Sequence, residues 1–213
     1  TKTKSFLLTS LVSHTVHSSM QHRQWLQRFL MTFMKFRLFH GMTTKTHTQA
    51  RWLEQSNISQ NSRNFNFLKA VKSNKFPISI PIYSHELYDT LSTRDVLNKC
   101  DIISVEGVIN LQDIEYKNAR ILEFYDLKIF INASVDNQRK WYTDRFFDNV
   151  KKSEDNPNSR FAKYINLPKS CILKNCNELW EKVNYTNLVN FIEPSMKNAD
   201  IVIYKNSSHE FEF

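Results

Sequence analysis

Glycine is nearly absent from this chain of 213 residues, which has only Gly41 and Gly107. A phosphate-binding loop of the pattern G-x-x-x-x-G-K-[ST] needs two glycines five residues apart, because its backbone N–H groups must approach the phosphates closely. Neither glycine is followed by a second one at that spacing. The sequence therefore lacks this loop.

Acidic residues are also scarce at one end, since the first aspartate is Asp89. Residues 1–64 hold nine Lys and Arg but one carboxylate, Glu54, whereas residues 65–213 hold twenty residues of each charge. The net charge of +8 therefore belongs to the N-terminal third and says nothing about the remainder. No aromatic–basic recognition motif accompanies this charge, so we expect no nucleic-acid partner. We divide the chain into a segment of unusual composition, 1–64, and a second part, 65–213.

Cysteine and long apolar runs are limited as well. Cys100, Cys171 and Cys176 are odd in number and lack metal-ligand or CxxC spacing, so we expect buried, reduced thiols in a cytosolic protein. No stretch approaches ~18 apolar residues, so no membrane span is expected. The short run at residues 6–8 is broken by Thr9 and Ser10, which argues against a leader peptide.

One amphipathic helix is predicted within the first 64 residues. Its apolar residues recur at helical spacing, with arginine and lysine between them: Trp25, Leu26, Phe29, Leu30, Phe33 and Phe36. The helix could pack on a core or lie on a membrane surface, and the core-facing alternative is favoured. The rest of the segment predicts no element.

Beyond residue 64 the pattern alternates between strands and helices. Apolar runs predict strands at 102–105, 127–131 and 201–204, and helices are expected at about 135–150 and 175–191. A short helix at 67–72 should end before Pro77. Strands that alternate with helices indicate an α/β fold with a parallel sheet covered by helices.

Two short sequence segments, which we call phrases, carry polar side chains at places where a site is expected. Glu106 and Gly107 directly follow the strand at 102–105, and ligands of parallel sheets bind beyond the carboxyl ends of the strands. A carboxylate there suits Mg²⁺ or an acceptor hydroxyl, although for Glu106 taken alone a helix-capping or turn carboxylate is the favoured interpretation. The second phrase, Tyr83–Asp89, supplies an imidazole and two phenols that can bind a carboxylate and hydroxyls: Tyr83, His85 and Tyr88.

A third phrase lies on the helix at 135–150, which Ser134 can cap. Tyr142, Arg145 and Phe146 share one face through their spacing of three and four residues. Arg145 could bind a carboxylate or phosphate through its planar guanidinium, or it could pair with a nearby acidic residue such as Asp144. Trp141 is expected in the core.

In this order, the three phrases resemble bacterial type I pantothenate kinases, and the resemblance extends over residues 64–213. Two further stretches match the same family, Asn156–Tyr164 and Leu179–Asn184. Uridine kinases and phosphoribulokinases share the fold class, but the phrases at 83–89 and 141–146 argue against them.

The resemblance implies a P-loop-kinase-like parallel sheet flanked by helices, incomplete at the N-terminus. It implies phosphorylation of pantothenate at its 4′-hydroxyl by ATP and Mg²⁺, the first step of coenzyme A biosynthesis, in a cytoplasmic homodimer that coenzyme A inhibits. It also implies a pocket for pantothenate or the pantetheine arm of coenzyme A, formed by Tyr83, His85, Tyr88, Tyr142, Arg145, Phe161, Tyr164 and Asn184, with Glu106 near the metal.

The ATP-binding half of such a kinase is not recognisable here. The family's catalytic base is an aspartate before the histidine phrase, where this chain has no aspartate. Residues 45–51 only faintly resemble the family's Gly-Lys-Ser-Thr-Thr-Ala-Arg. One interpretation is that residues 1–64 are an out-of-frame translation of the ATP-binding half, which translating the other two frames of the gene would test. The alternative is an inactive chain that binds pantothenate or coenzyme A, or that pairs with an intact subunit.

Overall fold

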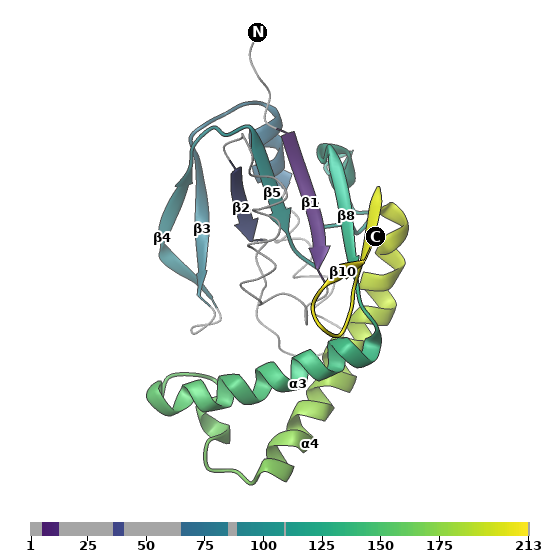
Figure 1. Cartoon of the computed structure of the whole chain (residues 1–213). Coiled ribbons are helices and arrows are strands. Elements are labelled where there is room, and N and C mark those ends of the chain that lie inside the picture. The colour runs from purple at the N-terminus through teal and green to yellow at the C-terminus, as the bar shows by residue number, and fades with distance from the viewer. Residues whose placement is uncertain (1–5, 13–35, 41–64, 85–88, 109, 213) are drawn as a thin grey trace.

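The computed structural model describes residues 6–12, 36–40, 65–84, 89–108 and 110–212, and the fold is that of an α/β protein (Figure 1). Its main sheet has six strands in the order β10-β9-β8-β1-β5-β2. All neighbouring pairs are parallel except β10 with β9. The strands are β1 (Phe6–Val12), β2 (Phe36–His40), β5 (Ile102–Glu106), β8 (Leu127–Asn132), β9 (Ile201–Lys205) and β10 (Phe211–Glu212).

The three strands predicted from apolar runs are confirmed as β5, β8 and β9. Ile103 and Ile131 are completely buried, and Phe130 is 1% exposed. Continuous apolar runs of this kind are typical of parallel strands, which are covered on both faces. The alternation of strands and helices therefore gave the correct class of sheet.

The N-terminal third contributes two strands that its sequence did not predict. β1 lies between β5 and β8, with Phe6 paired to Ile102 and Leu8 to Leu127. β2 pairs with β5 at the edge of the parallel sheet. Phe36, which helical spacing assigned to a helix, begins β2 instead; the other residues of that helix lie outside the described part of the chain. Pairing with β5, a contact distant in sequence, determines the conformation of this segment.

Two long helices follow the predicted pattern. α3 (Val135–Lys152) begins after Ser134, whose hydroxyl accepts a hydrogen bond from the backbone N–H of Asn137. α4 (Lys169–Leu179) begins six residues earlier than expected, directly after Pro168. The helical path then continues through two π-helical segments and a 3₁₀ turn: Trp180–Tyr185, Leu188–Ile192 and Glu193–Asn198. Residues 65–72 are also helical, ahead of Pro77 as expected.

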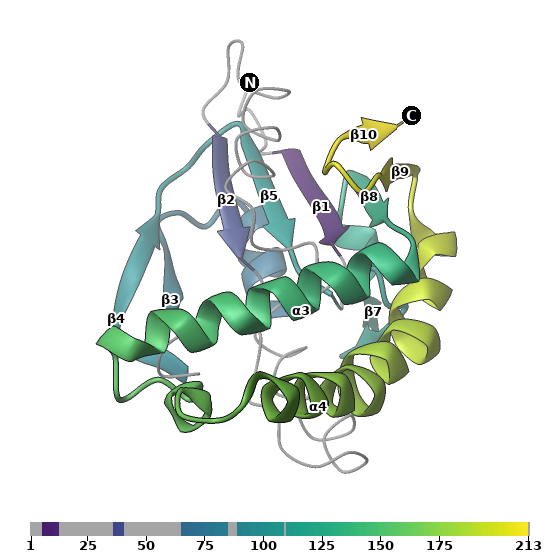
Figure 2. The same ribbon diagram turned by 60° about the horizontal axis from the view of Figure 1, so that its bottom comes forward.

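A hairpin of β3 (Ile78–Ser84) and β4 (Asp89–Leu97) lies on the β2 side of the sheet (Figure 2). Two short strands, β6 (Glu115–Tyr116) and β7 (Ala119–Arg120), form a second hairpin. Figure 1 shows α3 crossing beyond the carboxyl ends of the parallel strands, where ligands of such sheets bind. Among the residues described, no helix is both long and apolar enough to cross a bilayer.

The capping hydroxyl of Ser134 gives a direct test of the start of α3. Replacing Ser134 with alanine removes the acceptor for the Asn137 N–H and should lower the free energy of unfolding by about 1 kcal/mol. Urea denaturation measures the change. Ser170→Ala, an exposed serine in the first turn of α4, is the matched control and should change stability by less than about 0.5 kcal/mol. Equal effects of the two substitutions would contradict the assigned cap.

Candidate functional site

The carboxyl end of β5 presents a buried carboxylate. Glu106 is the last residue of β5 and is 1% exposed, with both carboxylate oxygens out of contact with solvent. The turn that follows is fixed by Asn110, whose Nδ2 donates to the Val105 carbonyl at 3.3 Å. A Cβ at Gly107 would lie 3.2 Å from that same nitrogen. A side chain at Gly107 would therefore require the Asn110 amide to shift by a few tenths of an ångström.

Asn110 is a site residue that the sequence analysis did not single out. It is 2% exposed, and its hydrogen bond to the Val105 carbonyl ties the turn to the end of β5. Glu106 is the carboxylate donor at this edge, a hard oxygen ligand of the kind Mg²⁺ prefers. Within the described ranges, no group of three or more His, Cys, Asp or Glu side chains is arranged to hold a metal.

The described residues of the histidine phrase end β3 and begin β4. Tyr83 and Ser84 end β3 and pair with Thr90 and Asp89 of β4, after an irregularity between Pro81 and Tyr83. In Figure 1 this end of β3 faces the same end of the molecule as the carboxyl ends of the parallel strands. His85 and Tyr88 lie outside the described residues. The backbone of Tyr83, Ser84 and Asp89, the described residues of the phrase, therefore lies at that end of the fold.

An aromatic cluster joins α3 to the helical segments around it. We define it as Tyr142, Phe146, Phe161, Tyr164 and Trp180. Tyr142 contacts Phe146 with ring centroids 6.1 Å apart and Trp180 at 5.6 Å. Phe161 and Tyr164 each lie 5.2 Å from Phe146. The structure thus brings together three predicted site residues, Tyr142, Phe161 and Tyr164.

The members of this cluster differ in exposure. Phe161 and Tyr164 are 9% and 8% exposed, so they pack mainly against protein, whereas Tyr142 is half-buried. Trp180, at 2%, is one of the largest fully buried side chains. Tyr142 is therefore the member of the pair Tyr142–Trp180 that retains access to a ligand.

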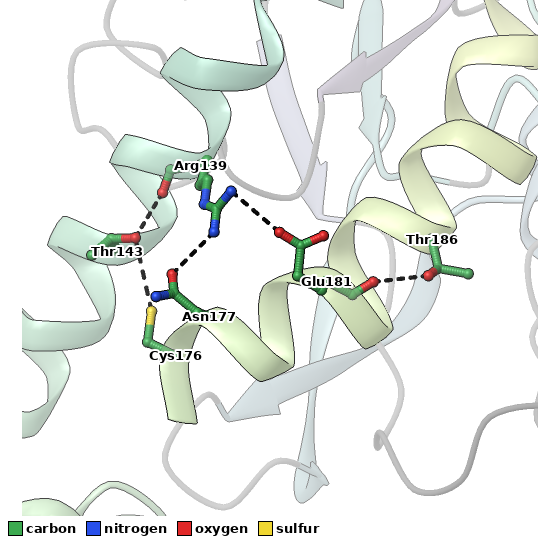
Figure 3. Close-up of polar contacts among 6 residues, drawn as sticks. All are labelled: Arg139, Thr143, Cys176, Asn177, Glu181 and Thr186. Carbon is green, nitrogen blue, oxygen red and sulfur yellow. Dashed lines mark hydrogen bonds and ion pairs between the residues drawn. The ribbon is translucent and has the colours of Figure 1, made fainter. Parts of the chain in front are cut away.

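Asn184, another predicted site residue, lies in the π-helical segment Trp180–Tyr185. Its Nδ2 donates to the Leu179 carbonyl, five residues earlier, at 3.4 Å. Thr186 makes the same kind of contact, with its hydroxyl donating to the Glu181 carbonyl at 2.9 Å (Figure 3). π-helical turns inside longer helices occur frequently at functional sites.

Polar contacts hold α3 and α4 together on another face (Figure 3). Arg139 pairs with Glu181 at 3.2 Å and donates to Asn177 at 3.4 Å. Thr143 donates to the Arg139 carbonyl, and the Cys176 thiol lies 3.8 Å from the Thr143 hydroxyl. Burial raises the pKa of Cys176, which keeps the thiol protonated. These contacts link α3, which carries Tyr142, to the helical path that continues from α4 to Asn184.

The expectation that all three cysteines are buried is wrong in one case. Cys100 and Cys176 are buried and Cys171 is exposed, while none of the three forms a disulfide. Cys171 lies near the start of α4, and its neighbour Ile172 takes the buried position on that helix. Helix phase therefore directs Cys171 outward.

Cationic groups gather where β9 ends. Lys205, the last residue of β9, is only 3% exposed, and its ammonium lies 5.4 Å from the centroid of Trp141 and 5.7 Å from that of Phe211. Burial, together with the charge of Arg145, lowers the pKa of Lys205 to about 8. Trp141, 6% exposed, belongs to the core as expected. Lys205 ends a parallel strand just as Glu106 does. The rule that ligands bind beyond the carboxyl ends of such strands would therefore also have predicted Lys205 as a site residue.

His209, a neutral imidazole beside these cations, is stacked on Trp141 with the ring centroids 4.5 Å apart. Burial lowers the pKa of His209, and the charges of Lys205, Lys140 and Arg145 lower it further. The charge of Arg145 therefore acts at the end of β9. Asp144, which the sequence offered as a partner for Arg145, pairs with Lys140 at 2.8 Å. A concentration of positive charge at this edge attracts anionic ligands.

The phosphate loop of a P-loop protein follows a strand of the parallel sheet. In this chain β1, the strand between β5 and β8, ends at Val12, and the residues after it, 13–20, read Ser-His-Thr-Val-His-Ser-Ser-Met. They include neither glycine nor lysine. Residues 45–51 follow β2, the edge strand, so their faint resemblance to the loop comes after a different strand.

Comparison with solved structures defines the fold class. The chain is similar to D-glycerate 3-kinase from Cryptococcus neoformans, with a TM-score of 0.59 and 12% identity over 98% of this chain and 89% of that one. It is also similar to phosphoribulokinase from Rhodobacter spheroides, with a TM-score of 0.50 and 11% identity over 97% and 71% of the two chains. The chain has the fold of the P-loop kinases.

Sequence comparison is more specific. The chain is 30% identical to pantothenate kinases from several strains of Streptococcus pneumoniae over 148 residues, which are 69% of this chain and 48% of the relatives. It thus spans about half the length of the curated relatives it matches. No protein-family model matches the chain. The resemblance to pantothenate kinases, predicted from the short phrases, is confirmed.

Lys205 gives a pH-dependent prediction. Its pKa is about 8 in the folded protein and near 10.5 in the unfolded chain, so the unfolded chain binds more protons between these values. The free energy of unfolding should therefore rise from pH 8 to pH 10.5, by up to about 3 kcal/mol relative to Lys205→Met. Urea denaturation at several pH values measures the difference, in which the contribution of other groups such as Cys176 cancels.

The matched control for this experiment is Lys140→Met, because the Lys140 side chain is 70% exposed. This variant should follow the pH profile of the unaltered protein. A Lys205→Met profile parallel to that of the unaltered protein would show that Lys205 is not held in the buried position described.

Proposed function

We propose that residues 65–213 form the acceptor-binding part of a pantothenate kinase, and that this part binds pantothenate and the pantetheine arm of coenzyme A. The observation that carries the proposal is the sequence similarity to pantothenate kinases over 148 residues. The geometry supports it, because Tyr142 and Arg145 lie on α3 beyond the carboxyl ends of the strands. An intact enzyme of this kind would transfer the γ-phosphoryl group of ATP to the 4′-hydroxyl of pantothenate.

The proposed contacts follow from the chemistry of the acceptor, which carries a carboxylate, an amide and two hydroxyls. Arg145 would bind the carboxylate through its planar guanidinium, and the cations at the end of β9 would strengthen that attraction. Tyr83, His85, Tyr88, Tyr142 and Asn184 would donate or accept hydrogen bonds, and Phe161 and Tyr164 would back the apolar part of the ligand. Glu106 would hold Mg²⁺, which neutralises phosphate charge when bound.

The sequence of the expected ATP-binding half supports only an inactive form of this proposal, in which the chain binds the acceptor without phosphorylating it. Phosphoryl transfer depends on positioned charge around the phosphates. Losing one preorganised donor typically costs ~3 kcal/mol of transition-state stabilisation, and this chain lacks the phosphate loop, its lysine and the expected aspartate. We therefore propose a chain that binds pantothenate or coenzyme A without phosphorylating it, alone or paired with an intact subunit. A cytoplasmic location, a homodimer and inhibition by coenzyme A are further proposals from the family.

Binding is tested by replacing His85 and Arg145 with alanine together. Because each supplies a charged or strongly polar hydrogen bond, the affinity for pantothenate and for coenzyme A should fall at least about 100-fold, measured by calorimetry. Lys140→Ala is the matched control, since it removes an exposed cation of the same helix that pairs with Asp144 instead. Unchanged affinity in the double variant would refute the proposed pocket.

Turnover is tested separately on the unaltered chain. With ATP, Mg²⁺ and pantothenate, a coupled assay should detect no phosphorylated pantothenate above background, because this chain lacks the loop that binds the phosphates of ATP. Pantothenate kinase from Streptococcus pneumoniae, assayed in parallel, shows that the conditions support the reaction. ATP-dependent product formation by this chain would contradict the inactive form of the proposal.

A further inference from the structure

Tyr142 is the exposed end of an aromatic contact that spans two helices. Its ring contacts Phe146 on its own helix and Trp180 at the start of the π-helical segment, with centroids 5.6 Å apart and ring planes at 44°. Trp180 is 2% exposed, so the surrounding protein fixes its ring, whereas Tyr142 is half-buried. The orientation of Tyr142 is therefore set by a side chain that a ligand cannot reach.

The π-helical segment links this contact to Asn184. Trp180 and Asn184 lie four residues apart within Trp180–Tyr185, which is close to one turn of a π-helix, so both side chains project to similar sides of the segment. Side-chain donors of Asn184 and Thr186 bond to carbonyls five residues earlier and stabilise the widened turn. Trp180 thus contacts Tyr142 of α3 from the segment that also carries Asn184.

We propose that Trp180 is a positioning residue, which acts through Tyr142 to orient the groups that bind pantothenate and coenzyme A. This inference rests on the proposed function. An aromatic pair of this geometry stabilises one orientation of each ring beyond simple burial of area. Without the indole, Tyr142 keeps its hydroxyl but loses the surface that fixes its ring. Ordering the ring when a ligand binds then costs binding free energy.

The test compares two substitutions of Trp180 in the full chain. Trp180→Leu retains an apolar core side chain but removes the ring, and should weaken the binding of pantothenate and coenzyme A about tenfold by calorimetry. Trp180→Phe keeps a ring against Tyr142 and should remain within about threefold of the unaltered chain. The matched control is Phe130→Leu, which removes a ring that is 1% exposed in the sheet and should lower stability without changing affinity.

A double-mutant cycle separates positioning from loss of core packing. If Trp180 acts through Tyr142, Trp180→Leu should cause no further loss of affinity in a Tyr142→Ala background. Losses that add, or a Phe130→Leu variant that weakens binding as much as Trp180→Leu, would overturn the assignment.

If the unaltered chain binds and Trp180→Leu binds equally well, Trp180 is not a positioning residue but the proposed function stands. If the unaltered chain binds neither compound, the proposed function fails and this inference fails with it.

Discussion

The parallel pairing of β5, β1 and β8 is the constraint on which the rest of the structure depends. Because parallel strands end at one edge, this ladder brings the end of β5, with Glu106, to the same edge as the end of β9, with Lys205. β8 ends at Asn132 and α3 begins three residues later, so the ladder also fixes where α3 starts. The candidate site is therefore a consequence of backbone hydrogen bonding before any side chain is considered.

A second layer of contacts decides how the acceptor-binding residues lie relative to one another. On one face of α3, Arg139 and Thr143 bond to the helical path that contains Asn177 and Glu181, and on another face Tyr142 packs on Trp180. The exposed ion pair contributes little to stability, and the buried rings contribute most of it. The helices are thus held by packing, while the polar contacts select their register.

Several features could not be predicted from the sequence because they depend on contacts distant along the chain. β1 and β2 form where helical spacing or polar composition gave no strand, since a neighbouring strand supplies their hydrogen bonds. Lys205 is a charged residue at a strand end, and only the packing of Trp141 and Phe211 shows that it is buried. The role of Asn110 depends on the turn at Gly107, where its amide packs and donates to the Val105 carbonyl. Cys171 was expected to be buried but is exposed, because the neighbouring Ile172 takes the buried position on α4.

The sequence alone determined the strands at 102–105, 127–131 and 201–204, the capped helix after Ser134, the similarity of residues 64–213 to pantothenate kinases and the absence of a phosphate loop. Each of these depends on local periodicity, on short phrases or on a count of glycines, which folding does not alter. Only the tertiary structure decided that the N-terminal third supplies β1, that the charge of Arg145 acts on Lys205 and His209, and that Trp180 contacts Tyr142. These relations join residues from separate elements, and they exist only once the sheet has formed and the helices have packed against it.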